Sequence, residues 1–431
     1  MKFKIVNFGC KVNTYESTYL EEVFLQNNYI EASSIEDANV IVINTCSVTN
    51  VADSKCKKMI RRIRRENNSA VIIATGCSVQ NNFEEYKNFG IDILVDNFHK
   101  SEIFNLYNEY LKTKEKIYKH DSNRKQVFEK MLLDKFTKHT RAFIKIQDGC
   151  DNFCSYCVIP LVRGSIRSKN FDDVISEAIE LSNNGHQEIV LVGIHTGSYN
   201  SDGKDLVDLI NEISKIDKIK NIRISSIEIT ELDEKFMDML KHNSKVVDHL
   251  HVPLQSGTDE ILKVMNRKYD TKYYENKINL IRSIRPDINI TTDVIVGHPY
   301  ETEELFDQTL DFCNKIGFGK IHVFPYSVRK NTAASIMPNQ VSEIDKKKRS
   351  EKLIRLSDIL MDKYENKFIS KEMEVITEIN HNGDVVGFTS NYIKVFITNS
   401  DGLTSNNRVM VKLIKRDKDF VYAEYIRKVD E

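Results

Sequence analysis

The sequence predicts an α/β protein in three parts: a parallel α/β domain, a partial barrel of six β/α units and a small all-β barrel. Three observations support this prediction. Strand and helix signals alternate through the first hundred residues, a second alternating series starts at residue 141, and short strands with Gly and Asn turns fill the end of the chain. A chain of 431 residues is too long for one ordinary core, and its 41% of apolar residues can form packed interiors.

Residues 1–112 are predicted to form the parallel α/β domain. Strand signals at 3–8, 40–43, 71–74 and 91–95 alternate with helical periodicity at 15–26, 54–65 and 102–111. This order implies a parallel sheet with helices on both faces. Cys10, Cys46 and Cys77 each follow the carboxyl end of a strand, which is the edge where open α/β sheets bind ligands.

Residues 113–140 are charged and lack a strong period, so we expect a linker or irregular connection there. The barrel domain is predicted over 141–370 and ends in a long charged helix at about 342–370. Its six strands are expected at 142–147, 188–192, 221–225, 249–252, 289–294 and 320–324. Six such units form a partial (β/α) barrel, whose chemistry lies at the carboxyl ends of the strands.

Residues 371–431 are predicted to form the all-β part. Its strands are expected at 373–379, 392–397, 408–413 and 421–425, which suits a small barrel.

Charge and hydropathy limit the possible partners. The net charge of −1 excludes a generally basic nucleic-acid binder, although a local basic face would be enough to bind RNA. Basic residues cluster within 55–65 and at 346–349, and a solvated helix surface is the alternative for each cluster. The chain has no signal peptide and no stretch long enough to span a bilayer, so we expect a cytoplasmic protein without a membrane partner.

Three cysteines stand close together at the start of the second alternating series. Cys150, Cys154 and Cys157 have the spacing C-x3-C-x2-C on a loop after a predicted strand. Three thiolates can bind one 4Fe–4S cluster and leave one iron open to a small-molecule ligand. The alternatives are a zinc site or inert buried cysteines, but a structural zinc wants four ligands and no His or Cys follows at finger spacing.

This loop and the residues around it, from Gln147 to Cys157, resemble the radical S-adenosylmethionine (radical SAM) superfamily. The resemblance implies that the open iron binds the amino and carboxylate groups of S-adenosylmethionine. One electron from the cluster then breaks a carbon–sulfur bond and gives a 5′-deoxyadenosyl radical. Tyr156 would pack near the adenine of the cofactor, with an ordinary place in the loop core as the alternative.

The contexts of the other three cysteines resemble the methylthiotransferase family. These contexts are residues 8–13 around Cys10, residues 44–49 around Cys46, and residues 75–77 ending in Cys77. The resemblance implies that the three thiolates hold a second 4Fe–4S cluster, which carries the sulfur to be inserted. Cys56 and Cys313 match no ligand position and are expected to be structural.

Other barrel segments resemble the same family and imply contacts to S-adenosylmethionine. They are residues 190–195, 223–228, 251–257, 265–267 and 291–297. The expected cofactor-binding residues are Tyr156, Gly193, Ser225, Ser226, Gln255, Arg267 and Val296. For single polar residues in this set, packing inside the barrel is the alternative. The chain departs from the family's usual residues at His298 and Tyr300, and again at Val328 and Asn331, which concerns the shape of nearby loops.

The terminal segment resembles the TRAM module, a small barrel that binds RNA, most clearly at residues 387–392. Such barrels bind single strands by aromatic stacking and a cationic groove. Lys394, Arg408, Lys412, Lys415 and Arg416 would supply the charge, with a solvated β surface as the alternative.

The motif Gly-Cys-Lys-Val-Asn at residues 9–13 is typical of the branch that acts on N6-threonylcarbamoyladenosine at position 37 of tRNA. The implied reaction is methylthiolation at C2 of that adenine in the anticodon loop, with an electron donor and a sulfur source as further partners. The substrate has a carboxylate, which requires a donor in its pocket. Arg163 and Arg167 are candidates for this donor, with ordinary ion pairing as the alternative.

Several alternatives stay open at this stage. The substrate could be isopentenyladenosine 37 of tRNA or a ribosomal-protein aspartate, and the chain could be a non-catalytic iron–sulfur RNA-binding or redox-sensing protein. The complete set of barrel motifs argues against a sensor, which needs no methionyl pocket.

Overall fold

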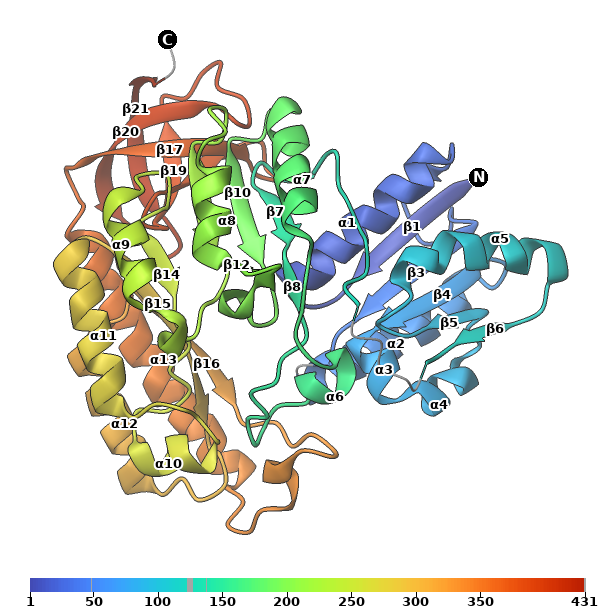
Figure 1. The fold of residues 1–431 in the computed structure, drawn as a ribbon, viewed down its shortest axis with the longest axis horizontal. Helices are drawn as coiled ribbons and strands as arrows, with labels where there is room; N and C mark the ends of the chain where they lie inside the picture. Colours follow the sequence, from blue (N-terminus) through green and yellow to red (C-terminus); the bar gives the residue numbers. More distant parts are fainter. Residues whose placement is uncertain (48, 122–126, 137, 430–431) are drawn as a thin grey trace.

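The computed structural model describes residues 1–47, 49–121, 127–136 and 138–429. Its first domain is a parallel sheet of order β2-β1-β3-β4-β5-β6, covered by helices on both faces (Figure 1). Leu20, Phe24 and Tyr107 pack one helix layer on the sheet, and Ile60 and Ile63 pack the other. The elements are β1 (Lys2–Asn7), α1 (Lys11–Gln26), β2 (Ile30–Glu31), β3 (Val40–Thr45), α2 (Asn50–Glu66), β4 (Val71–Gly76), α3 (Cys77–Asn81), α4 (Phe83–Tyr86), β5 (Ile93–Val95), α5 (Ile103–Thr113) and β6 (Ile117–Lys119).

The segment 113–140, predicted as an irregular connection, departs from that prediction in two ways. Ile117–Lys119 forms β6, which pairs in parallel with β5. Further along, Met131, Leu133 and Phe136 are buried in the core of the barrel domain. Of the described part, residues 117–119 are thus a strand, which is too short to show a period, and residues 127–136 are irregular chain with three side chains packed in the barrel core.

The middle domain has the six predicted parallel strands in two sheets, β13-β10-β7 and β14-β15-β16. An isolated parallel bridge between Ile222 and Val246 joins the two sheets. The predicted partial barrel is thus confirmed, with helices on its outer face (Figure 1). Its main elements are β7 (Ala142–Lys145), α7 (Phe171–Asn183), β10 (Glu188–Val192), α8 (Leu206–Ile213), β13 (Asn221–Ile224), α9 (Glu234–His242), β14 (His249–His251), α11 (Thr271–Ile284), β15 (Asn289–Val296), α12 (Glu303–Ile316), β16 (Lys320–Pro325) and α13 (Glu343–Asn366).

Shorter elements lie in the loops of this domain. They are β8 (Gln147–Asp148), α6 (Ile159–Arg163), β9 (Arg167–Ser168), β11 (Asn200–Ser201), β12 (Lys204–Asp205) and α10 (Asp259–Val264).

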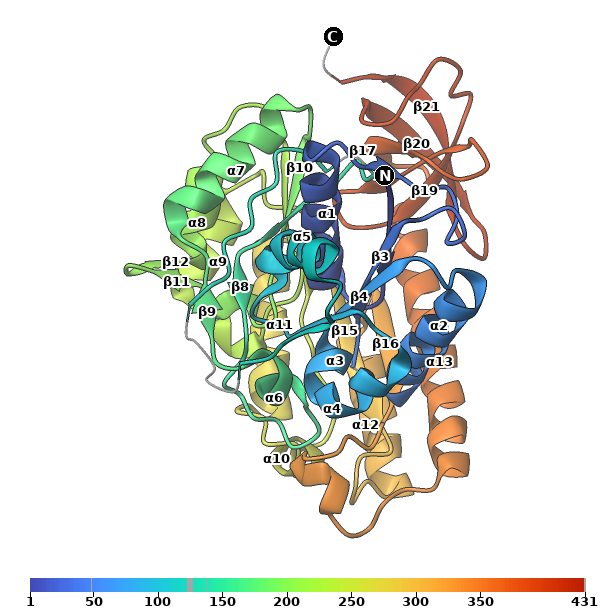
Figure 2. The same cartoon turned by 90° about the vertical axis from the view of Figure 1, so that its right-hand side faces the viewer.

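The first domain contacts both ends of the open barrel (Figure 2). On one side Val12 of α1 packs in a cluster with Phe143 on the end strand β7 and with Val190 and Val192 on its neighbour β10. On the other side the amide N–H of Asn50, at the start of α2, donates to Ser327 Oγ at 3.1 Å in the loop after β16. The first domain therefore covers the gap that a partial barrel leaves.

The terminal domain is a closed barrel of order β17-β18-β19-β21-β20, which confirms the predicted small β-barrel. The sequence analysis missed β18, because Gly387 interrupts its strand signal. A Cβ at Gly387 would lie 2.4 Å from Val375 Cγ1, so the close approach of two strands requires glycine there. The strands are β17 (Glu372–Ile379), β18 (Val385–Thr389), β19 (Lys394–Thr398), β20 (Arg408–Arg416) and β21 (Val421–Lys428).

Hydrogen bonds attach the terminal barrel to the middle domain. Asn391 donates to Tyr364 Oη at 3.0 Å, and Asn289 Nδ2 donates to the Asn391 carbonyl at 2.8 Å. Among the described residues, none of the helices is both long and apolar enough for a membrane span.

Candidate active site

The first cysteine triad lies on the loop after β7 and β8. Cys154 is buried, and Cys150 and Cys157 are half-buried. Gly149 shapes this loop: its φ is +77°, and a Cβ there would lie 1.9 Å from the Ser165 carbonyl oxygen. Gln147 Nε2 donates to the Gly149 carbonyl at 2.7 Å. The loop is therefore held by its own side chains.

Residues 265–267 hold the other side of the same loop. The Ser155 amide N–H donates to the Met265 carbonyl at 3.0 Å. Arg267 Nη1 donates to Cys154 Sγ at 3.3 Å, and its other terminal nitrogen pairs with Glu228. Arg267 thus contacts one of the three thiols. Its ion pair with Glu228 is a contact within the protein and does not bear on the predicted contact with the cofactor.

His298, one of the departures from the family's usual residues, also contacts the loop. Its Nε2 lies 3.1 Å from Ser155 Oγ, between the second and third cysteines. Burial lowers the pKa of His298 to about 4, so the ring is neutral at pH 7.

The second triad lies at the carboxyl edge of the first sheet, after the neighbouring strands β1, β3 and β4. Cys10 is exposed, and Cys46 and Cys77 are buried. A Cβ at Gly9 would lie 3.2 Å from Cys46 Sγ, so the loops that contain Cys10 and Cys46 are packed together. Asn97 Nδ2 donates to Cys77 Sγ at 3.6 Å. The fold therefore gathers three cysteines that are far apart in the sequence.

Cys56 and Cys313 are buried, as expected of structural cysteines. Burial raises the pKa of each thiol to about 12.

Arg163, on α6, joins the surroundings of the two triads. Its Nε donates to Cys77 Sγ at 3.2 Å, and its Nη1 lies 3.0 Å from both Glu16 Oε1 and Asp148 Oδ1. Burial alone would raise the pKa of Glu16, but Arg163, Lys100 and Lys145 hold it well below its ordinary value.

The structure favours ordinary ion pairing, the alternative given above, over contact of Arg163 or Arg167 with the substrate carboxylate. Both residues are buried, with 1% and 6% exposure. Arg167 donates to the Arg163 carbonyl at 2.7 Å and lies 3.4 Å from Asp148, so both guanidinium groups are already paired inside the protein.

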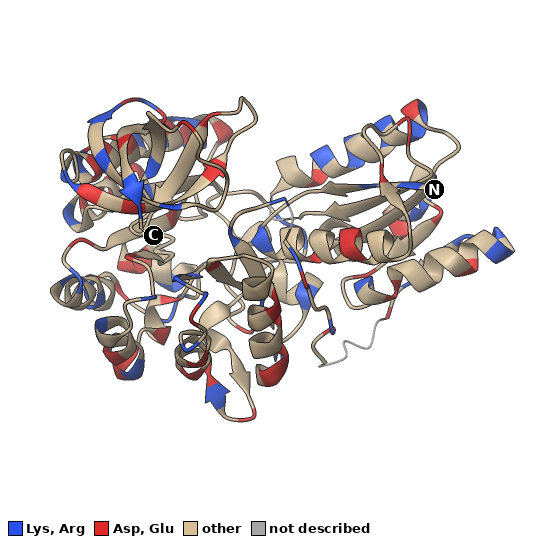
Figure 3. Ribbon diagram, turned by 90° about the horizontal axis from the view of Figure 1, so that it is seen from above, with Lys and Arg blue, Asp and Glu red and all other residues tan. Residues whose placement is uncertain are grey.

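The basic cluster at residues 346–349 is likewise only partly exposed. Lys346 and Arg349 are buried and pair with Glu343 and Glu301, at 2.7 Å in each case. Lys and Arg are mixed with Asp and Glu throughout the molecule (Figure 3).

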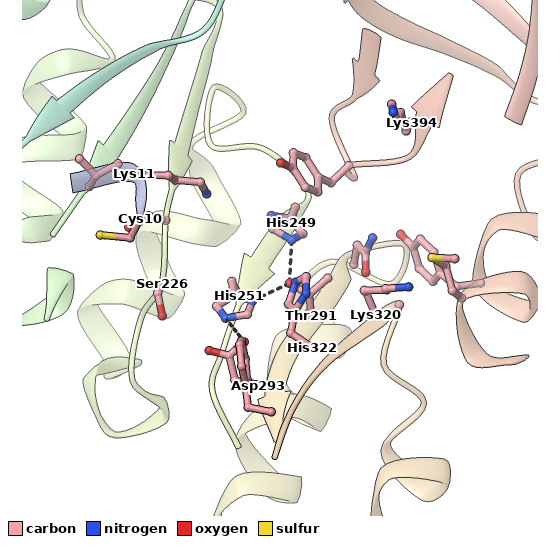
Figure 4. Close-up of a pocket in the computed structure, with 18 of the residues that line it drawn as sticks. Cys10, Lys11, Ser226, His249, His251, Thr291, Asp293, Lys320, His322 and Lys394 are labelled. Carbon is pink, nitrogen blue, oxygen red and sulfur yellow. Dashed lines mark hydrogen bonds and ion pairs between the residues drawn. The ribbon is translucent and has the colours of Figure 1, made fainter. Parts of the chain in front are cut away.

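A large cavity of ≈ 630 Å³ lies between the three domains (Figure 4). It extends from Cys10 and Lys11 to Tyr392 and Lys394 of the terminal barrel. Of the expected cofactor-binding residues, Gly193, Ser225 and Ser226 line this cavity.

A second cavity of ≈ 200 Å³ adjoins the first cysteine loop. Tyr156, Cys157 and Gln255 line it. Val296 is fully buried in the barrel core and lines neither cavity, whereas its neighbour Ile295 lines the second one. The expected cofactor-binding residues thus divide between two adjoining spaces, with Arg267 at the cysteine loop.

The sequence analysis missed a chain of polar side chains across the large cavity. Thr291 Oγ1 lies 2.9 Å from His249 Nε2 and 3.0 Å from His251 Nδ1, and His251 Nε2 lies 3.3 Å from Asp293 (Figure 4). His322 lies beside His251, with ring centroids 5.6 Å apart and the ring planes tilted by 52°. The signal was present, because polar residues alternate with apolar ones on β14, β15 and β16, and so share the inner face.

The donor chemistry fits iron–sulfur clusters better than a zinc ion. Within the described ranges, no three His, Cys, Asp or Glu side chains gather closely enough to hold a single metal ion. In a four-iron cluster each thiolate binds a different iron, so the sulfurs stand further apart than around one ion. N–H donors to Cys77 and Cys154 are also suited to stabilising thiolates.

Two family models match the chain. A model of the radical SAM superfamily matches residues 144–313, and a model described as uncharacterized protein family UPF0004 matches residues 2–96.

Relatives match nearly the whole chain. The threonylcarbamoyladenosine tRNA methylthiotransferase of Bacillus subtilis (strain 168) is 37% identical over 98% of this chain and 96% of its own length. The tRNA-2-methylthio-N(6)-dimethylallyladenosine synthase of Rickettsia canadensis (strain McKiel) is 29% identical over 98% and 99%, respectively. A solved structure of the radical SAM methyltransferase TsrM from Kitasatospora setae has a TM-score of 0.57 and 14% identity, covering 78% of this chain and 75% of that one, which is a likeness of fold.

Proposed function

Because the chain belongs to the radical SAM methylthiotransferase family, we propose that it converts N6-threonylcarbamoyladenosine at position 37 of tRNA to its 2-methylthio derivative. The observation that supports this most strongly is the large cavity. It joins Cys10 of the second triad to the barrel residues Gly193, Ser225 and Ser226. A base bound in this cavity would lie between Cys10 of the second triad and the carboxyl ends of the barrel strands β10 and β13.

Under this proposal each triad would hold one 4Fe–4S cluster, with S-adenosylmethionine at the first. When bound, these groups supply the radical that acts on C2 of the adenine and the sulfur that is inserted there. The chain's own residues bind and orient. Tyr156 and Gln255 would contact the cofactor in the smaller cavity, and Gly193, Ser225 and Ser226 would contact it from the larger one.

The lining of the large cavity supports the threonylcarbamoyl substrate over the isopentenyl one. Lys11, His249, His251, His322 and Lys394 all line it. An isopentenyl group is apolar and would offer these polar groups no acceptor, while it would displace the water around them. A carboxylate offers them an acceptor.

The remaining partners follow from the reaction. We propose that the terminal barrel contacts the tRNA, that an electron donor and a sulfur source act on the clusters, and that the protein works in the cytoplasm with its tRNA. Position 37 lies in the anticodon loop, where unstacked bases are open to a protein pocket.

The test uses the anaerobically reconstituted enzyme with three tRNAs that differ only at position 37. These bear threonylcarbamoyladenosine, isopentenyladenosine or plain adenosine. Mass spectrometry of the nucleosides should find a methylthio product only with the first. Product from the isopentenyl tRNA alone would overturn the substrate and keep the reaction class. Modification of a ribosomal protein, with no tRNA product, would overturn the tRNA substrate altogether.

A further inference from the structure

We propose that Lys11, His249 and Tyr392 form an anion-binding subsite at one end of the large cavity, and that Lys11 Nζ binds the carboxylate of the threonylcarbamoyl group directly. This inference rests on the proposed function and adds the residue that recognises the substrate's modification. Figure 4 shows Lys11 on one wall of the cavity and His249 on the wall that faces it.

Lys11 is a cation that still needs a partner. Within the described part of the chain, no hydrogen bond or ion pair engages its Nζ. Another lysine of the cavity, Lys320, already lies 3.4 Å from Asp358. Lys11 is therefore the better placed of the two to receive an incoming anion.

The surroundings of Tyr392 hold an excess of positive charge. Arg223 lies over its ring at 4.6 Å, and Arg141 donates to its hydroxyl at 3.4 Å. Only two carboxylates pair with the three cations Lys11, Arg141 and Arg223. Glu188 accepts from Arg223 at 2.8 Å, and Glu378 pairs with Arg141 at 3.1 Å.

The unpartnered terminal nitrogens of Arg223 are an independent indication that this end of the cavity binds an anion. The residue is 1% exposed, yet both of its terminal nitrogens lack a hydrogen-bond partner. A buried guanidinium whose two terminal nitrogens, with their four N–H groups, find no acceptor is costly. Although the ring of Tyr392 lines the cavity and Arg223 itself does not, an anion beside that ring would reduce the excess charge.

His249 supplies a second polar contact at the same end. Its Nδ1 is buried without a partner, while its Nε2 lies 2.9 Å from the hydroxyl of Thr291. Its ring stacks on Tyr392, with centroids 4.6 Å apart. Burial and, to a smaller extent, the positive charge of Arg223 hold the pKa of His249 well below its ordinary value, so the ring is neutral. A neutral ring can donate from Nδ1 when the Thr291 hydroxyl donates to Nε2.

The position of Lys11 in the chain connects recognition to chemistry. It directly follows Cys10, so their Cα atoms stand about 3.8 Å apart. An anion at Lys11 therefore sets the modified base beside the second triad. An RNA phosphate has the same charge as a carboxylate, and the experiment must separate the two sources.

The experiment measures binding of the reconstituted holoenzyme, with S-adenosylmethionine present, to tRNAs that bear threonylcarbamoyladenosine or plain adenosine at position 37. The wild type should prefer the modified tRNA. Lys11→Gln should weaken binding of the modified tRNA about 10- to 100-fold and leave the plain tRNA nearly unchanged. Lys11→Arg should restore most of the preference. Lys320→Gln, which removes a paired lysine from the same cavity, should keep the preference.

A second measurement does not depend on any variant. Wild-type enzyme should bind tRNA whose threonylcarbamoyl carboxylate is converted to its methyl ester about as weakly as plain tRNA. Full-strength binding of the ester would overturn the carboxylate assignment. An equal loss on both tRNAs in Lys11→Gln would assign the subsite to a phosphate and overturn it as well. A preserved preference in Lys11→Gln overturns only the role of Lys11, whereas a wild type without preference contradicts the proposed substrate itself.

Discussion

Gly149 is the residue at which the first cysteine loop most needs the absence of a side chain. With a φ of +77°, it lies in a region that L side chains rarely adopt, and the Ser165 carbonyl stands where its Cβ would be. The neighbouring cysteine, Cys150, follows directly. The backbone geometry at this one position thus sets where the first thiol lies.

Gly149→Ala should therefore displace the loop and cost the first cluster. We expect the iron content of reconstituted protein to fall from about eight to about four per chain, measured by a colorimetric iron assay. The matched control is Gly203→Ala, which has a φ of +85° but nothing within 4 Å of its Cβ. Similar iron loss in both variants would show that φ strain, and not the clash with Ser165, is responsible.

Single residues show the limit of sequence-based prediction. The six cysteines of the triads were predicted as cluster ligands from spacing and from the family resemblance, and this assignment stays a prediction, although the fold places each triad in one region. Arg163 could not be assigned correctly, because its role depends on Cys77, Glu16 and Asp148, which only the fold brings together. The unpaired state of Lys11 was equally hidden, since a sequence does not show which lysines find partners.

Helix α1 belongs to two domains at once. Leu20 and Phe24 pack under the first sheet, while Val12 and Tyr15 pack into the barrel domain. Its Glu22 accepts a hydrogen bond at 3.0 Å from the amide of Lys135, in the segment that enters the barrel. The helix therefore fixes the first domain to the second along its whole length.

Glu22 makes this contact dependent on pH. Burial raises the pKa of Glu22 from 4.5 to about 7, partly opposed by hydrogen bonds from the amides of Lys135 and Asp134. Between pH 4.5 and about 7 the Glu22 carboxyl group is ionised in the unfolded chain and protonated in the folded one. The free energy of unfolding therefore falls as the pH rises through this range. Above about pH 7 the loss is complete.

Glu22→Gln removes this loss and keeps an acceptor for Lys135. It should stabilise the protein by on the order of 2 kcal/mol at pH 8, allowing for partial exposure, and by nearly nothing at pH 4. Unfolding temperatures across this range, compared with the wild type, provide the measurement. A gain that is the same at both pH values would contradict the proposed pKa.

Most elements could be predicted, because their strands are buried and strongly apolar. The six barrel strands and the strands before the second triad were found within a few residues of their true ends. The exceptions have local reasons. β6 has only three residues, and β18 contains Gly387, which the neighbouring strand requires. The strand predicted from residue 392 starts at Lys394, because Tyr392 has a φ of +67°.

At the scale of the whole molecule, the buried charges between the first two domains act as one network. Arg163, Lys100 and Lys145 surround Glu16, and Arg163 also meets Asp148. All five side chains are at most 5% exposed. Breaking such a network leaves charges that neither water nor a partner can reach.

Arg163→Met should destabilise the protein by about 3 kcal/mol, the lower end for a broken buried pair, because Lys100, Lys145 and Arg167 still face the carboxylates. Calorimetry should show a clear fall in the unfolding temperature, and Arg163→Lys should lie between. The control is Arg62→Met, which removes an exposed pair with Glu66 on the surface of α2 and should change the unfolding temperature little. Equal effects of the two Met variants would mean that the network adds nothing beyond a surface pair.

The large cavity takes its walls from all three domains, with Tyr392 and Lys394 supplied by the terminal barrel. A module of this kind is usually thought to increase the grip on any RNA. Under the proposed function it also forms part of the surface that a single nucleotide meets. Selectivity for a nucleotide would then change during evolution through substitutions in the terminal barrel, while the cysteines proposed to hold the clusters stay as they are. Chimeras that exchange this module between branches of the family would exchange part of the choice of base along with it.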